Sequence, residues 1–223
     1  MSGSGYPREV TDAATDRSLS RLERRDRAAG ATRASIVEAA RSAILTDGHV
    51  ALSTRRVAEL AGVPLSQIHY HFGSKRQLIL AVLAAENERL LDRQARMFDT
   101  PEPLWQRWER ACDYLDEDVV SGYVRILQEM IAAGWSDPEV AASVRELLSG
   151  WYRLLADVAR REAESGADLG PFSAEEIAAL MGMPFLGAEE MILLGMPETV
   201  LPARSALRKV GALLRRLAEG ETP

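Results

Sequence analysis

The segment LAGVPLSQIHYHFGSK, residues 60–75, gathers side chains that could do chemistry. It contains two of the three histidines of the chain, His69 and His71, beside a tyrosine and a lysine. Histidines that bind zinc from one helix are typically four residues apart, so that both rings lie on one face. His69 and His71 are two residues apart and would point about 200° away from each other on a helix. The spacing argues against a metal site or histidine catalysis, and we expect no cofactor.

Two other interpretations of this segment remain. In the first, Ile68 and Phe72 belong to the core, and the polar residues around them form an ordinary surface. In the second, a short helix enters the major groove of DNA, which is about 12 Å wide and accepts a helix. Such a helix presents neutral donors, acceptors and aromatic rings, here Leu65, Ser66, Gln67, His69 and Tyr70. Basic residues that could bind phosphates flank the segment at Arg55, Arg56, Lys75 and Arg76.

Apolar residues at three- and four-residue spacing predict helices through almost the whole chain, and no segment has the alternation of a strand. A first helix over 32–47 ends at Gly48, a second begins after Ser53 or Thr54 and ends at Gly62, and a third covers 64–70. This order of helix, glycine turn and helix is a helix-turn-helix. Further helices are expected over 74–97, 104–118, 122–134, 137–165, 173–194 and 203–219. The predicted fold class is all-α, with about nine helices.

Residues 33–83 resemble the DNA-binding domain of the TetR family of bacterial transcriptional regulators. The segment matches the family pattern in one register at Arg33, Ile36, Ala39, Ala40, Gly48, Thr54, Val57, Ala58, Ala61, Gly62, Val63, Ile68, His71, Phe72, Lys75 and Leu78. The resemblance covers about a quarter of the chain. It implies a helix-turn-helix domain over 31–78 that binds double-stranded operator DNA. It also implies a helical domain over 79–223 that binds a small molecule and dimerises.

The resemblance further implies roles for single side chains. Thr54, Tyr70, His71 and Lys75 would hold phosphates. Arg55, Ser66 and His69 would face base edges, and Arg56 and Gln67 would contact the backbone or a nearby base. The chain departs from the family pattern at Pro64, Ser66 and His69, and we expect these positions to set which DNA sequence is read.

Charge is divided unevenly along the chain. The formal net charge is −6, but residues 1–85 carry a net +4 and residues 86–223 a net −10. This division favours a basic module that approaches phosphates, joined to an acidic module. Residues 1–30 are expected to form a flexible arm. Its arginines could follow a minor groove, while its acidic residues favour a solvated tail; the arginines are Arg17, Arg21, Arg24, Arg25 and Arg27.

Two expected C-terminal helices are unusually apolar. The helix over 173–194 is apolar almost all round, and the helix over 203–219 has an apolar seam of Leu207, Val210, Leu213, Leu214 and Leu217. Such faces have to be covered. They predict a homodimer in which the two helices of each copy form a four-helix bundle. The alternative is that both helices pack inside one monomer.

All four tryptophans lie between residues 105 and 151. Their concentration, with nearby tyrosines and methionines, favours a cavity for a small apolar or aromatic effector, although the same residues could simply form core. The expected lining residues are Trp105, Trp108, Tyr123, Met130, Trp135, Trp151, Met181 and Phe185. Glu129 could meet a cationic ligand, but Arg125, one turn earlier, is its expected partner. The identity of the effector stays unknown.

Composition and motifs argue against several other classes of protein. A hydrophobic fraction of 47% is ample for a buried core. No apolar run predicts a membrane span or a signal peptide, so we expect a cytoplasmic protein associated with the nucleoid. Cys112 is the single cysteine and can form no disulfide within the chain. No Walker loop, GxSxG, HExxH or CxxC motif is present, so we expect no enzyme.

The function that these observations predict is a ligand-responsive transcriptional regulator. We expect a repressor that binds operator DNA as a homodimer and is released by its effector. A transcriptional activator and a ligand-independent DNA-binding protein are alternatives of the same class. A helical enzyme and a helical adaptor are alternatives of another class.

Overall fold

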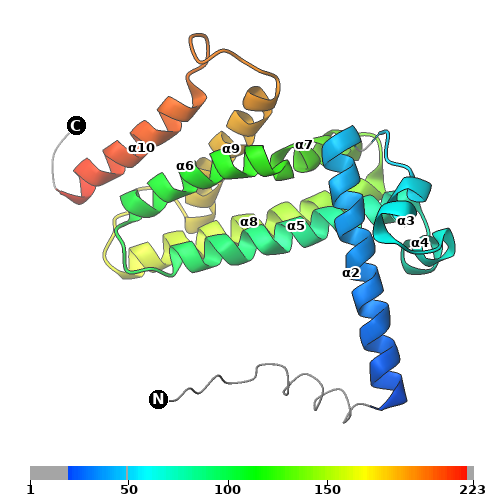
Figure 1. The fold of residues 1–223 in the computed structure, drawn as a ribbon. Coiled ribbons are helices and arrows are strands. Elements are labelled where there is room, and N and C mark those ends of the chain that lie inside the picture. Colours follow the sequence, from blue (N-terminus) through cyan, green and yellow to red (C-terminus); the bar gives the residue numbers. More distant parts are fainter. Residues whose placement is uncertain (1–19, 49, 220–223) are drawn as a thin grey trace, which may run out of the picture. The chain divides into compact units, whose positions relative to one another are not determined.

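The computed structural model describes residues 20–48 and 50–219. The elements of this part are nine α-helices with no strand, which confirms the predicted all-α fold class (Figure 1). The chain divides into two compact units, Met1–Leu78 and Ile79–Pro223. No helix within the described ranges is long and apolar enough to cross a membrane.

The first unit contains α2 (Arg21–Asp47), α3 (Thr54–Ala61), α4 (Leu65–Phe72) and the start of α5 (Lys75–Phe98). Apolar residues of α2 recur every three or four positions and form one buried face. The helix α3 packs on α2, and α4 packs on α3. The core of this unit consists of fully buried side chains from these four helices, among them Ile36, Ile44, Val57, Ile68 and Leu78.

The helix α2 begins eleven residues before the expected start at 32. Ser20 and Glu23 form a capping box: the Glu23 N–H donates to Ser20 Oγ, and the Ser20 N–H donates to a Glu23 carboxylate oxygen. The described side chains in the first part of the helix, those of residues 21 and 23–31, are exposed or half-buried and form no buried apolar face, so periodicity could not reveal it. Residues 21–30 of the expected flexible arm are therefore helical, and residues 1–19, including Arg17, lie outside the described residues.

The second unit contains the rest of α5 and the helices α6 (Leu104–Ser121), α7 (Tyr123–Gly134), α8 (Pro138–Glu164), α9 (Ala174–Leu193) and α10 (Ala203–Ala218). The ends of these helices agree with the expected ranges to within three residues. Within this unit α5 and α8 run side by side (Figure 1), and the Trp151 indole of α8 donates to Gln94 Oε1 of α5 at 2.7 Å.

Two clusters of buried residues hold the second unit together. One joins the end of α5 to α8 and α9 through Met97, Phe98, Leu155, Val158 and Ala178. The other joins α6 to α9 and α10 through Trp108, Cys112, Leu115, Phe185 and Leu207. The sequence placed Leu207 on the apolar seam of the expected dimer interface. In the structure Leu207 is buried within its own chain, because it packs against Trp108 of α6.

Candidate functional site

The helix-turn-helix is built by a glycine turn between α3 and α4. Gly62 ends α3 in the left-handed conformation, with φ 66° and ψ 30°, which a side chain would disfavour. The next residue, Val63, donates its N–H to the carbonyl of Ala58 at 3.0 Å. Pro64 stands before α4, and its carbonyl accepts the N–H of Gln67 at 2.9 Å. The first turn of α4 is therefore hydrogen-bonded through the backbone, although Pro64 has no side-chain oxygen to cap the helix.

One side of α4 holds it to the domain and the other faces outward. Ile68 and Phe72, four residues apart, are buried, and the Arg33 guanidinium of α2 lies over the Phe72 ring at 5.2 Å from its centroid. Away from this buried side, Leu65, Ser66, His69 and Tyr70 are exposed, and Gln67 is half-buried. The exposed side thus carries hydroxyl, imidazole and phenol groups with no carboxylate.

The residues expected to hold phosphates lie at the ends of α3, α4 and α5. Thr54 is the first residue of α3 and is half-buried. Tyr70 is 74% exposed, and its ring meets the half-buried His71 ring edge-on with centroids 5.0 Å apart. Lys75 Nζ donates to the Val50 carbonyl at 2.7 Å. An ammonium group has three donors, so this bond positions Lys75 and leaves it able to bind a phosphate.

The two arginines of α3 are both exposed. Arg56 lies 3.8 Å from Glu59, one turn along the helix, in a pair that solvent screens strongly. Arg55 makes no ion pair within the described residues. No three of the described His, Cys, Asp and Glu residues lie close enough together to hold a metal ion.

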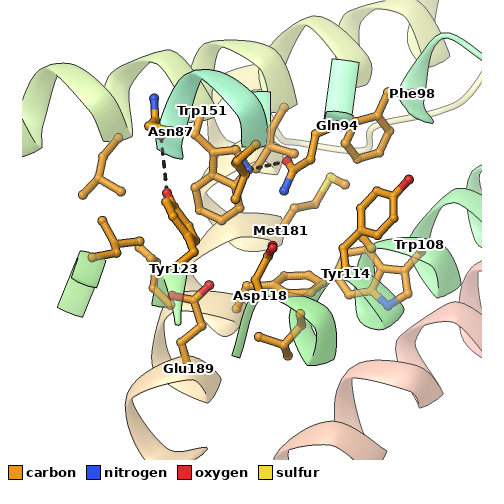
Figure 2. A pocket seen from close by; sticks show the side chains of 18 residues that line it. Asn87, Gln94, Phe98, Trp108, Tyr114, Asp118, Tyr123, Trp151, Met181 and Glu189 are labelled. Carbon is orange, nitrogen blue, oxygen red and sulfur yellow. Dashed lines mark hydrogen bonds between the residues drawn. The ribbon is translucent and has the colours of Figure 1, made fainter. Parts of the chain in front are cut away.

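The second unit contains a partly open cavity of about 50 Å³ between α5, α6, α7, α8 and α9 (Figure 2). Five of the eight residues expected to line a ligand cavity lie in its wall: Trp108, Tyr123, Trp151, Met181 and Phe185. The rest of the wall is mostly apolar or aromatic and includes Phe98, Tyr114, Leu127 and Leu155.

The other three expected lining residues do not lie in the wall of this cavity. Trp135 follows α7 and is 81% exposed, because the helix ends before it. Trp105 lies near α10, where the Arg215 guanidinium is 5.2 Å from its ring centroid. Met130 is buried in the core on α7. Glu129 forms an ion pair of 3.0 Å with Arg125, as their i, i+4 spacing predicts.

The sequence did not reveal the polar residues of the wall. Asn87, Gln94, Asp118 and Glu189 line the cavity, and Figure 2 shows the Asp118 and Glu189 carboxylates among the aromatic side chains. Tyr123 Oη donates to Asn87 Oδ1 at 3.4 Å. An acidic residue inside an apolar helix pattern, such as Glu189 in GAEEMILL, was the available signal, but spacing alone did not show that it faces inward.

Burial controls the protonation of the cavity carboxyls. Glu189 is 9% exposed, and desolvation raises its pKa to about 7, against the opposing effect of the hydrogen bond from Gln128. Desolvation also raises the pKa of Asp118, although Arg93, its ion-pair partner, opposes the shift. The pKa of the Tyr123 phenol is raised too, chiefly by burial. Near neutral pH, the protonated and the ionised forms of Glu189 are therefore both populated.

Comparison with known proteins gives independent evidence on the family that this chain resembles. Residues 36–82 match the model of the family described as bacterial regulatory proteins, tetR family. The chain is 28% identical over 120 residues to the HTH-type transcriptional regulator UidR of Escherichia coli K12, a match of 51% of this chain and 57% of that protein. The chain thus spans about half the length of the curated relatives that it matches.

Solved structures resemble the fold over most of the chain. A protein from Saccharomonospora viridis in complex with choline has a TM-score of 0.66 at 22% identity, over 81% of this chain and 95% of that one. The transcriptional regulator FadR from Bacillus subtilis, in complex with stearoyl-CoA, has a TM-score of 0.66 at 14% identity, over 81% and 96%. At these identities the likeness establishes the fold alone.

The all-α fold and the exposed second helix after a glycine turn define a helix-turn-helix protein. The match over residues 36–82 then confirms the resemblance of residues 33–83: this segment is similar to the DNA-binding part of the tetR family of bacterial regulatory proteins, and the curated relatives that the chain matches are HTH-type transcriptional regulators. The relatives that it matches are regulators, which supports the expectation that it is not an enzyme.

Proposed function

We propose that the protein represses transcription by binding operator DNA as a homodimer, and that a small molecule in the cavity of the second unit releases it. The observation that carries the proposal is the exposed side of α4, which presents Ser66, His69 and Tyr70 beside the exposed arginines of α3. A helix with neutral polar groups outward and cations at its flanks suits the major groove. The proposed site of action is the nucleoid.

Each unit has a part in this proposal. Residues 31–78 would bind DNA, with Arg55, Ser66 and His69 at base edges and Leu65 against an apolar base surface. Phosphates would be held by Thr54, Tyr70, His71 and Lys75, while Arg56 and Gln67 contact the backbone or a nearby base. Residues 79–223 would bind the effector and dimerise. The α5 helix, which begins at Lys75 and ends at Phe98, contributes residues to both units and is the expected connection.

The proposed dimer uses residues 173–194 and 203–219. Large apolar side chains are exposed on α9, on α10 and between them: Leu180, Met183, Leu194, Val200, Leu201 and Leu213. Exposed apolar residues grouped in this way are a common mark of an interface between copies. A homodimer would present two copies of α4 to successive major grooves, which lie about 34–36 Å apart.

Release would follow from the preference of the effector for one arrangement of the dimer. A ligand shifts such an equilibrium only by its difference in affinity for the two states, and about 1–3 kcal/mol changes operator occupancy about 5–150-fold. Two structural relatives are in complex with choline and with stearoyl-CoA, which supports the proposal that this chain binds a small molecule. They do not identify the effector of this chain.

Binding to the DNA that flanks its own gene tests this function. Fluorescence anisotropy of a labelled duplex should show saturable binding that an unlabelled scrambled duplex does not displace, at about 50 and about 200 mM salt. The stoichiometry should be two chains for each site, measured by sedimentation of the complex. Equal affinity for the flanking and the scrambled duplex at the higher salt would contradict the proposal.

A further inference from the structure

We propose that the cavity takes a small organic ammonium ion with an apolar body. The inference rests on the proposed function, because it names the class of effector for the same cavity. The sequence alone favoured an apolar or aromatic effector. The charged groups in the wall change that expectation.

The ionisable groups of the cavity wall are acidic. Asp118 of α6 and Glu189 of α9 line the cavity, and its 18 lining residues include no lysine, arginine or histidine. Asp118 is balanced by an ion pair with Arg93, which is itself not part of the wall. A ligand in the cavity therefore meets a negative potential, which favours a cation over a neutral or anionic compound.

Glu189 is the group that lacks a counterion. Its side chain accepts one hydrogen bond of 3.1 Å, from Gln128 Nε2, and it makes no ion pair within the residues that the structure describes. A buried carboxylate without a cation is unfavourable, and it is stabilised by any cation that reaches it. An ammonium group beside Glu189 would provide that partner and donate hydrogen bonds to the carboxylate.

The aromatic part of the wall also suits a cation. Five aromatic side chains line the cavity together: Trp108, Trp151, Tyr114, Tyr123 and Phe185. Figure 2 shows the first four of them around it. The faces of such rings attract ammonium and guanidinium groups. One ring already has a cation over it, since the Arg93 guanidinium lies 4.1 Å from the centroid of the Tyr114 ring.

The size of the cavity limits the ligand. A water molecule needs about 10–15 Å³ of such volume, so about 50 Å³ accommodates roughly three to five groups of that size. An ammonium head with a short alkyl body of a few carbons fits, whereas a drug-sized ligand would extend beyond this volume. Butylammonium is therefore a suitable probe.

Binding should depend on pH through Glu189. The titratable groups that face it are Asp118 on α6, Tyr123 on α7 and Tyr152 on α8. Neither tyrosine loses its proton below pH 8, because burial raises the pKa of both phenols. Glu189, with a pKa of about 7, changes from largely protonated at pH 6 to largely ionised at pH 8. The affinity for a cation should therefore rise about five- to tenfold over this range.

The first experiment compares three compounds with the same four-carbon body: butylammonium, butan-1-ol and butanoate. Fluorescence of the full chain, in which Trp108 and Trp151 line the cavity, is titrated with each compound at pH 8 and constant ionic strength. We expect butylammonium to bind at least about tenfold more tightly than butan-1-ol, which corresponds to about 1.4 kcal/mol, and butanoate more weakly than both. Equal or tighter binding of the alcohol, or binding of none of the three, overturns the proposal.

The second experiment assigns the preference to one carboxylate. Glu189→Gln should remove the preference for butylammonium over butan-1-ol and the change between pH 6 and pH 8. Glu190→Gln, which removes an equal charge from the adjacent exposed residue of α9, should keep both. If both variants behave alike, Glu189 is not the group responsible and the proposal fails. If Glu189→Gln does not fold, the pH dependence of the unaltered chain decides, since it is expected for butylammonium and not for the alcohol.

The two proposals fail in distinguishable ways. Operator binding is measured by anisotropy on the same samples. Specific DNA binding without a preference for butylammonium overturns the inference about the ligand and leaves the proposed function standing. A preference for butylammonium in a chain that binds no operator supports the cation site and contradicts the proposed function.

Discussion

The indole N–H of Trp108 donates a hydrogen bond of 2.7 Å to the backbone carbonyl of Leu207. This bond joins α6 to α10, and both residues are buried. The same indole ring meets Phe185 of α9 with centroids 5.3 Å apart and forms part of the cavity wall. One side chain thus contacts both the cavity and the two helices of the proposed dimer interface.

Trp108→Phe should therefore destabilise the second unit. The change keeps an aromatic ring but removes the indole N–H that donates to the Leu207 carbonyl, and the loss of one such bond costs about 0.5–1.5 kcal/mol. Urea unfolding followed by circular dichroism measures the loss. Trp135→Phe is the matched control, since Trp135 is exposed and its replacement should change the unfolding free energy by less than about 0.5 kcal/mol. Equal effects of the two changes would show that the bond contributes nothing.

Gly182→Ala should disturb the contact of α9 with α8. A Cβ at Gly182 would lie 2.6 Å from Tyr152 Cε1 and 3.1 Å from Trp151 Cζ3, so these rings would have to shift. Overpacking of this kind costs about 1–3 kcal/mol. At Gly187, on the same helix, a Cβ would meet no atom within 4 Å, so Gly187→Ala should instead stabilise the helix by about 0.5–1 kcal/mol. The two midpoints of thermal unfolding should therefore move in opposite directions.

The sequence predicted the fold well wherever an apolar face defines a helix. The helix-turn-helix was predicted from the spacing of Ile36, Ala40 and Ile44 and from the glycine at 62. The ends of the later helices were predicted from the proline and glycine residues of the turns between them. The first part of α2 was missed because it is stabilised by a capping box and has no apolar face. The cavity was only partly predicted, since residue type does not reveal direction: Trp135 points to solvent, while Glu189 points inward.

Tyr70→Phe should weaken operator binding at least about tenfold without changing its salt dependence. The phenol would donate a hydrogen bond to a charged phosphate, worth about 1.5–3 kcal/mol, and because the phenol is uncharged it releases no counterion. Lys75→Gln should weaken binding and also lower the slope of log affinity against log salt by about one, because it removes a cation. Anisotropy titrations at several salt concentrations measure both quantities. An unchanged affinity of Tyr70→Phe would contradict the placement of α4 against the DNA backbone.

Glu189→Gln should stabilise the chain at pH 8 and change its stability little at pH 5. Because burial raises the pKa of Glu189 from 4.5 to about 7, the folded state favours the protonated form. The contribution of protonated Glu189 to the free energy of unfolding is complete below pH 4.5 and is lost as the pH rises to 7. This effect is roughly 3 kcal/mol at most. Urea unfolding at the two pH values, without ligand, measures the difference, and Glu190→Gln should show none. A loss of stability in Glu189→Gln at pH 8 would mean that an ionised Glu189 is favourable in the empty cavity. This result would contradict the inference that the Glu189 carboxylate lacks a counterion that a cationic ligand supplies.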